Sequence, residues 1–346
     1  MKLTQFSPGA GCGCKIAPAI LQQILRTNEP ISLFPNLLVG NEHSDDAAVF
    51  DIGGGRAVVS TTDFFTPIVD DAFDFGRIAS ANAISDIFAM GGTPLMAIAI
   101  LGWPLDKLPA EEAANVVAGA RAVCSEAGIP LAGGHSINIS DPIFGLAVTG
   151  LVSTDWVKKN SSAQEGAILF LTKPIGIGLV TTGEKFGCAT ERQKAGALQL
   201  MTTLNSAGKR FAQISGVCAM TDVTGFGLLG HCLEMAQGSG LCAEIDYAKI
   251  PRIEGVETLI EQQCIPGGTQ RNFTSYGHHV SPLDDEQKAL LCDPQTNGGL
   301  LIAALPEAVQ QLRDAARQAD APLYEIGRMT APSRSHAYKV VVSTSS

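Results

Sequence analysis

The 346-residue sequence has no apolar run long enough to cross a membrane. Its most apolar stretch, residues 95–103, has about half of the roughly 20 residues that a spanning helix requires. The first 14 residues lack the apolar segment of a secretion signal. Basic residues are also scarce, 24 against 34 acidic ones, and the resulting net charge of −10 argues against non-specific nucleic-acid binding. We therefore expect a cytoplasmic protein that binds neither membranes nor nucleic acids.

Aromatic and charged residues are few, at 6% and 17% of the chain. Packing explains Trp103, Trp156 and the scattered phenylalanines better than a stacking platform does. With 45% hydrophobic residues, the low charge predicts large cores and little disorder. The nine cysteines are an odd number spread along the chain, as is typical of a reducing compartment.

Helical and strand patterns succeed one another, which predicts an α/β (α+β) protein long enough for two domains. The clearest helices are expected at 74–90, 109–127, 178–186 and 226–237, and the clearest strands at 57–62, 144–152, 167–172 and 242–246. The polar stretch 153–165 marks a domain boundary. We therefore divide the chain into a flexible glycine-rich loop (1–16), an N-terminal domain (17–154) and a C-terminal α/β domain (155–346).

Four local expectations accompany this division. Asp74 is expected to cap the helix that ends near Met90. Residues 95–101 are expected to form a buried strand, and the strand that begins at Leu131 is expected to end in a turn at Gly133. Residues 266–272 are expected to form a glycine-containing loop.

Residues 9–15, Gly-Ala-Gly-Cys-Gly-Cys-Lys, combine a permissive backbone with two thiols and a cation. Lys15 suits a phosphate and favours the reactive thiolate of Cys12 or Cys14. A metal half-site, a redox pair and a terminus with incidental cysteines are the alternatives. The segment is no Walker A loop, because Cys14 precedes Lys15 and Ile16 stands where Ser or Thr would be.

Four aspartates, Asp46, Asp63, Asp86 and Asp222, recur at strand ends or on an apolar helix. An ionised aspartate in such surroundings is costly without a cation or hydrogen-bond donors. Carboxylates of this kind suit Mg²⁺, which bridges protein oxygens to phosphates. Any one of them alone is better explained as a turn cap, but the set beside a lysine-bearing loop favours a metal–nucleotide site.

A competing pattern occurs at residues 225–230, Gly-Phe-Gly-Leu-Leu-Gly, which match the dinucleotide fingerprint and precede Asp246 by about 20 residues. The preceding strand is short, however, and Asp222 would lie beside the pyrophosphate, so we rank this interpretation second. His135 and Arg271 are ambiguous. His135 either contacts a ligand or ends a strand, and Arg271 either holds a phosphate or lies in solvent.

Taken together and in order, the motifs resemble those of the selenophosphate synthetases (selenide, water dikinases) over nearly the whole chain. The motifs are Gly9-Ala-Gly-Cys12-Gly-Cys-Lys15, Asp45-Asp46-Ala-Ala-Val, Ser60-Thr-Thr-Asp63-Phe-Phe, Asn82-Ala-Ile-Ser-Asp86-Ile-Phe-Ala-Met-Gly-Gly, Ala132-Gly-Gly-His-Ser136, Met220-Thr-Asp222-Val-Thr-Gly-Phe-Gly and Asp293-Pro-Gln-Thr-Asn-Gly-Gly. One departure is Asn297, where the family pattern has Ser.

The resemblance implies an enzyme that uses ATP, selenide and water to form selenophosphate, AMP and orthophosphate. Selenophosphate is the selenium donor for selenocysteine and seleno-tRNA synthesis. The resemblance further implies the aminoimidazole ribonucleotide synthetase-like fold, a homodimer whose N-terminal domains form an intersubunit β-barrel, and a possible selenium-delivery protein as a partner.

The same resemblance implies roles for individual residues. Cys12 and Lys15 match the catalytic positions. Asp46, Asp86 and Asp222 match ligands of Mg²⁺, in a number of ions left open. The positions that match ATP contacts are Lys15, His43, Ser44, Asp45, Asp63, Asp86, Gly134, His135 and Ser136. Two rival functions remain: an ATP-dependent kinase or cyclo-ligase of the same fold, and a thiol carrier without catalysis.

Overall fold

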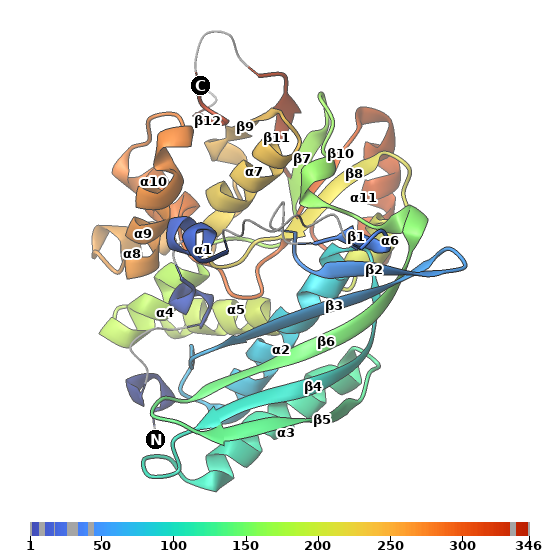
Figure 1. Cartoon of the computed structure of the whole chain (residues 1–346). Helices are drawn as coiled ribbons and strands as arrows, with labels where there is room; N and C mark the ends of the chain where they lie inside the picture. The colour runs from blue at the N-terminus through green and yellow to red at the C-terminus, as the bar shows by residue number, and fades with distance from the viewer. Residues whose placement is uncertain are drawn as a thin grey trace.

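The computed structural model describes residues 2–6, 11–16, 18–25, 34–40, 45–332 and 337–344. Two six-stranded mixed sheets dominate it, one built before residue 154 and the other after residue 167. Figure 1 shows them one above the other, with helices around each. Among the described helices, none has the length and hydrophobicity needed to cross a membrane.

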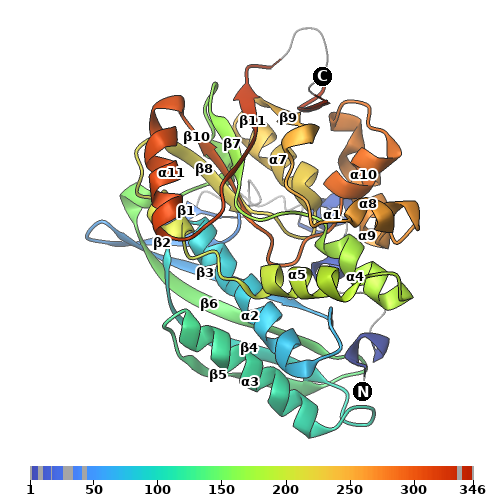
Figure 2. The same cartoon turned by 180° about the vertical axis from the view of Figure 1, so that it is seen from behind.

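The first sheet has the strand order β1-β2-β3-β6-β4-β5. Its strands are β1 (Leu37–Val39), β2 (Ala48–Gly53), β3 (Arg56–Phe65), β4 (Thr93–Trp103), β5 (Leu131–Asn138) and β6 (Ile143–Ser153). The helices α2 (Ala72–Ala89) and α3 (Ala110–Glu126) pack side by side on one face (Figures 1 and 2). Along β3, Ala57, Val59 and Phe65 are buried while Ser60 and Phe64 are exposed, as expected for a sheet covered on one side only.

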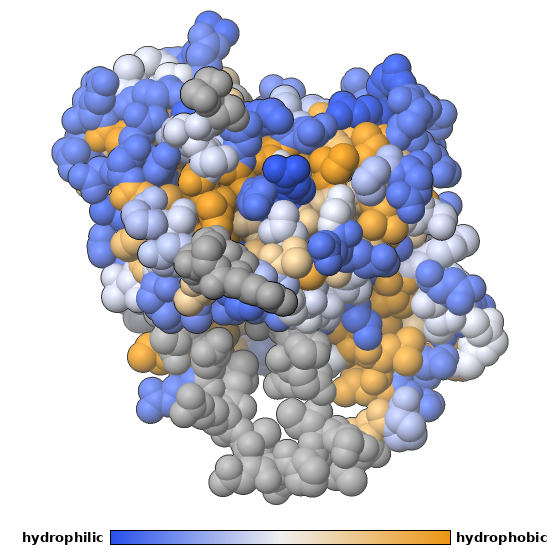
Figure 3. All heavy atoms as spheres, turned by 90° about the horizontal axis from the view of Figure 1, so that it is seen from above, coloured by the Kyte–Doolittle hydropathy of each residue, from blue (hydrophilic) through white to orange (hydrophobic). Residues whose placement is uncertain are grey.

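The uncovered face corrects the expectation of a buried strand at 95–101. Leu95, Met96 and Ile98 of β4 are 46%, 46% and 47% exposed, because α2 and α3 cover only the opposite side. Phe64 on β3 is 46% exposed for the same reason. Apolar side chains also reach the surface in the view of Figure 3, where orange spheres adjoin a mostly hydrophilic rim.

The second sheet has the order β12-β9-β11-β7-β10-β8. Its strands are β7 (Ile168–Leu171), β8 (Val217–Asp222), β9 (Cys242–Asp246), β10 (Leu300–Ala304), β11 (Tyr324–Thr330) and β12 (Val340–Ser343). The accompanying helices are α4 (Ile177–Phe186), α5 (Glu191–Thr202), α6 (Gly208–Phe211), α7 (Gly227–Gly238), α8 (Val256–Glu261), α9 (Gly267–Tyr276), α10 (Asp285–Leu291) and α11 (Val309–Gln318). Helices cover both faces, so every residue of β10 is buried.

Three further local expectations were wrong. Asp71, not Asp74, caps α2, because the Asp71 side chain accepts a hydrogen bond from the backbone N–H of Asp74. Strand β5 continues through the glycines to Asn138, held by its parallel pairing with β4. Residues 266–272 form no loop, since α9 begins at Gly267 directly after Pro266. The strand expected at 57–62 extends further, to Phe65.

Helix α2 joins the two halves of the molecule, and this explains why it is apolar on nearly all sides. One side packs on β3 and β6, and others meet α3, α5 and β8. The approach to α6 is close: a Cβ atom on Gly208 would lie 2.5 Å from the carbonyl oxygen of Phe88. The polar residues of α2 from residue 80 onward, Ser80, Asn82, Ser85 and Asp86, are therefore buried.

Candidate active site

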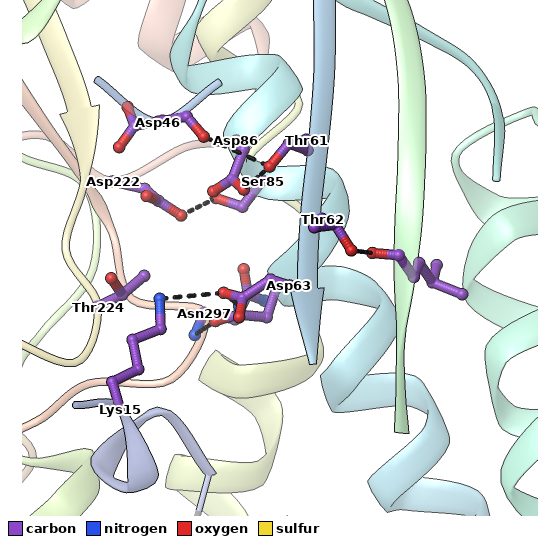
Figure 4. A network of polar contacts seen from close by, with 12 residues as sticks. Lys15, Asp46, Thr61, Thr62, Asp63, Ser85, Asp86, Asp222, Thr224 and Asn297 are labelled. Carbon is purple, nitrogen blue, oxygen red and sulfur yellow. Dashed lines mark hydrogen bonds and ion pairs between the residues drawn. The ribbon is translucent and has the colours of Figure 1, made fainter. Parts of the chain in front are cut away.

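Three aspartates from three separate segments meet where the two sheets adjoin (Figure 4). Asp46 precedes β2, Asp86 lies on α2 and Asp222 ends β8. The carboxylates of Asp86 and Asp222 are buried, with residue exposures of 8% and 1%. The sequence positions of these residues are far apart, and only the packing of α2 between the halves brings them together.

Each of these carboxylates accepts a hydrogen bond from a hydroxyl group. Thr221 Oγ1 donates to Asp46 Oδ1 over 2.8 Å, Thr61 Oγ1 to Asp86 Oδ2 over 2.6 Å, and Ser85 Oγ to Asp222 Oδ2 over 2.5 Å. Sequence reasoning did not identify these donors. Ser85 and Thr221 directly precede Asp86 and Asp222 in the chain, and that adjacency is the signal that could have found them.

The pKa values of the three aspartates are raised. For Asp46, burial is the main cause, followed by repulsion from Asp222 and Asp86. Burial also raises the pKa of Asp86 well above its usual range, again with Asp222 adding repulsion. Burial also raises the pKa of Asp222, and the hydrogen bond from Ser85 partly offsets this rise. The cluster is thus an accumulation of negative charge that the protein alone does not neutralise.

A divalent cation fits this cluster. Among the described residues, no three histidine, cysteine, aspartate or glutamate side chains are close enough to form a complete metal site as they stand. However, Asp46 Oδ2 is buried and has no hydrogen-bond partner within the part of the chain that the structure describes. An unpaired carboxylate oxygen next to mutually repelling carboxylates is what Mg²⁺, with its preference for oxygen ligands and its retained waters, would satisfy.

Lys15 reaches the site from the N-terminal segment. Its Nζ atom lies 3.2 Å from Asp63 Oδ2, and the same oxygen accepts a 2.6 Å hydrogen bond from Asn82 Nδ2. Asn82 Oδ1 in turn accepts from the backbone N–H of Asn297. Asp63 therefore orients Lys15 and is itself held by α2 and by the loop before β10.

The 3₁₀ turn Gly11–Cys14 is fixed at two points. The N–H of Gly11 donates to the carbonyl of Thr66 over 3.1 Å, and Nη2 of Arg271 donates to the carbonyl of Gly13 over 2.8 Å. Arg271 was expected either to hold a phosphate or to lie in solvent; it is exposed and also contacts the glycine-rich segment. The turn includes the backbone of Cys12 and Cys14, whereas their side chains lie outside the described part of the chain.

The other residues predicted for the site are not all placed at the aspartate cluster by the structure. His43 and Ser44 lie outside the described residues. The side chain of Asp45 accepts a hydrogen bond from the N–H of Asn160 over 2.8 Å. The segment 134–136 is exposed on β5, three strands away from β3, which corresponds to about 14 Å. Within one chain, the structure does not bring this segment to the aspartates.

Lys173 is a buried cation that sequence reasoning missed. It is 5% exposed, and its Nζ donates to the carbonyls of Thr203 and Asn297 over 2.7 and 2.8 Å. Burial lowers its pKa to about 7, while the charge of Asp222 acts in the opposite direction. Nothing in the short strand-to-turn sequence around Lys173 distinguished it from a surface lysine.

Packing explains the dinucleotide-like glycines. Gly227 has φ +72°, and a Cβ atom there would lie 2.8 Å from the backbone of Cys292. A Cβ atom on Gly230 would lie 2.6 Å from Phe226. Asp246, the acidic residue that follows these glycines in the fingerprint, accepts a hydrogen bond from the N–H of Ala248 and caps a 3₁₀ turn.

Comparison with known proteins agrees with this architecture. Residues 44–152 match the AIR synthase related protein N-terminal domain, and residues 164–339 match its C-terminal domain. A selenide, water dikinase of Yersinia pseudotuberculosis is 58% identical over 343 residues, 99% of either chain. Another, from Pasteurella multocida, is 57% identical over 331 residues, 96% of this chain and 94% of that protein. Thiamine-monophosphate kinase from Stenotrophomonas maltophilia, at 20% identity, covers 93% of either chain with a TM-score of 0.67. The expected fold is confirmed.

Proposed function

The chain belongs to the selenide, water dikinases, and we propose that it converts ATP, selenide and water to selenophosphate, AMP and orthophosphate. The observation that carries the proposal is the meeting of Asp46, Asp86 and Asp222 beside Lys15 (Figure 4). Carboxylates suited to a cation, next to a lysine on a glycine-rich segment, are the parts that phosphoryl transfer requires. The site therefore has both a cation-binding cluster of carboxylates and a lysine for the phosphates of ATP.

The three aspartates are the proposed ligands of Mg²⁺, which when bound would neutralise charge on the phosphates. Asp46 supplies its unpaired oxygen, and Thr61 and Ser85 orient the other two carboxylates. Lys15 leaves Asp63 for a phosphate oxygen, a short movement because the ion pair lies at the edge of the same site. Asp63, with Asn82 behind it, then guides the returning lysine after product release.

Cys12 is the proposed selenium-handling residue. Its backbone lies between Gly11, which bonds to Thr66 directly after β3, and Gly13, which bonds to Arg271. A position fixed on both sides suits a residue that must bind or position selenium for attack on the terminal phosphate of ATP. Because Lys15 follows on the same segment, a thiolate at Cys12 and the phosphate-binding lysine would be presented together.

A homodimer completes this proposal. The uncovered face of the first sheet carries Phe64, Leu95, Met96 and Ile98, all nearly half exposed. A second copy packing on this face would bury them and form the intersubunit barrel. It would also account for segment 134–136, since the β5 strand of the partner subunit, rather than the chain's own, would then contribute to each nucleotide site.

Product analysis tests the function. Wild-type protein with Mg²⁺ and ATP should form AMP and two phosphate-containing products when selenide is present, and little AMP without it. Cys12→Ser should lose selenide-dependent AMP formation and retain nucleotide binding, with Cys124→Ser as a control far from the site. Accumulation of ADP as the end product would favour the kinase or cyclo-ligase, and binding of selenide without ATP hydrolysis would favour the carrier.

A further inference from the structure

A cavity of about 260 Å³ adjoins the turn Gly11–Cys14 on the side of α4 and α9. Its wall includes Gly13, Thr181, Lys185, Arg271 and Thr296. None of the three clustered aspartates lines it, and neither does Lys15. The cavity therefore shares the glycine-rich turn with the proposed active site but is a separate space.

The charged residues that the structure describes in the wall of this cavity are both cations. Lys185 and Arg271 line it, and no described aspartate or glutamate does. Within the described part of the chain, neither cation forms an ion pair with a carboxylate. In a chain with a net charge of −10, two cations facing one cavity without a carboxylate partner favour an anionic occupant.

Arg271 is oriented for such an occupant. A Cβ atom on Gly267 would lie 3.3 Å from Arg271 Nη1, so the guanidinium folds back over the first turn of its own helix. The hydrogen bond to the carbonyl of Gly13 uses one of the five N–H groups of this side chain. No side chain in the described ranges caps α9, whose first residues, Gly267 and Gly268, also line the cavity. At α4, by contrast, Gln295 and Asp293 already accept from the first N–H groups.

We propose that this cavity binds a small tetrahedral dianion of the phosphate class next to the glycine-rich turn. The inference rests on the proposed function, because orthophosphate and selenophosphate, both products of that reaction, share this chemistry. The dianion accepts from N–H groups of Arg271 that the hydrogen bond to Gly13 does not use. Its binding therefore adds a charged contact to the side chain that anchors the turn, which links product occupancy to the position of Cys12 and Lys15.

The test is direct binding of inorganic phosphate, measured by calorimetry. Nucleotide and selenide are left out, and EDTA is added to keep divalent cations from the aspartates. Loss of a charge-assisted hydrogen bond weakens binding about tenfold or more. We expect that weakening in Arg271→Gln and in Lys185→Gln. Lys194→Gln, which removes a lysine paired with Glu191 outside this cavity, should bind phosphate as the wild type does. Unchanged thermal unfolding of the variants ensures that they are folded.

Three results would overturn the proposal. The first is no phosphate binding by the wild type, and the second is wild-type affinity in both Arg271→Gln and Lys185→Gln. The third is loss of binding in Lys15→Gln alone, which would place the anion in the nucleotide site. Thiophosphate, a stable analogue of selenophosphate, distinguishes which of the two products the cavity binds. Tighter binding of thiophosphate than of phosphate supports selenophosphate, and weaker binding supports orthophosphate. The assay requires no turnover, so its failure is distinguishable from failure to form AMP.

Discussion

Asn82 and Asn297 are 215 residues apart in the chain, and the side-chain oxygen of Asn82 accepts a 2.7 Å hydrogen bond from the backbone N–H of Asn297. The amide group of Asn82 simultaneously donates to Asp63 over 2.6 Å. Asn297 has φ +49°, a conformation that asparagine tolerates better than most residues. Its own side chain donates to the carbonyls of Met201 and Thr203. One buried amide on α2 thus links the loop before β10 to the aspartate that pairs with Lys15.

Replacing Asn82 by Leu should affect both stability and turnover. The change leaves the buried N–H of Asn297 without its partner, which costs about 1–3 kcal/mol. It also removes one of the two donors to Asp63 Oδ2, so that Lys15 alone among the described residues contacts this oxygen. Urea unfolding measures the stability, and AMP formation at saturating ATP measures the positioning of Lys15. Ser80→Ala is the matched control, since Ser80 is buried on the same helix but bonds only to the carbonyl of Gly76. Equal effects of the two changes would contradict the role of Asn82.

Asp86→Asn should separate metal binding from folding. The variant keeps a hydrogen-bonding side chain next to Thr61 and removes one of the repelling charges. We expect affinity for Mg²⁺-ATP to fall more than about tenfold, since even indirect partners of metal ligands cost that much. Stability without metal should not decrease, because the lost charge was unfavourable. Titration of nucleotide binding against Mg²⁺ checks this, and an unchanged metal dependence would remove Asp86 from the site.

Gly11→Ala should impair catalysis through the position of the turn. Gly11 has φ +51°, and a Cβ atom would lie 2.5 Å from Ile68 Cδ1 and 2.6 Å from Thr296 Oγ1. The turn or these two side chains must shift to relieve this, and the φ angle of Gly11 also disfavours alanine. Misplacement of catalytic groups by about 1 Å can cost on the order of 100-fold in rate. Gly53→Ala is the control, because Gly53 has φ +82° but open space around it. Similar turnover in the two variants would show that the position of the turn does not limit the reaction.

Asp293 should make stability depend on pH. Burial raises the pKa of this carboxyl group to about 8, with hydrogen bonds from Gln295 and Gly178 acting against the rise. A raised pKa means that the folded state retains the proton longer than the unfolded state does. The resulting stability is fully present below about pH 4 and is lost as the pH rises to about 8. Asp293→Asn does not titrate, so its unfolding free energy relative to the wild type should increase across this window. Parallel pH curves in urea unfolding would contradict the shift.

The sequence allowed the ligand types of the site to be predicted, but not their surroundings. Asp46, Asp86 and Asp222 each stand in a local pattern of small, apolar and glycine residues that a reader of the chain can find. The contacts of Asn82 with Asn297 and of Arg271 with Gly13 join positions more than 200 residues apart. No local pattern encodes such pairs. The exposed face of β4 was missed for a related reason: its apolar run is typical of a buried strand, and only the positions of α2 and α3 show which side is uncovered.

The proposed dimer predicts complementation between two inactive variants. Asp86→Asn removes a residue of the aspartate cluster, and His135→Ala alters the exposed strand β5. If β5 of the partner subunit completes each site, a mixed dimer contains one site with both wild-type residues and one with neither. Since random mixing makes half of the dimers mixed, about a quarter of wild-type activity should return. Subunits are mixed by unfolding and refolding the two variants together, and AMP formation is compared with that of each variant refolded alone. If β5 instead served its own chain, neither site of a mixed dimer would be intact, and activity would not return.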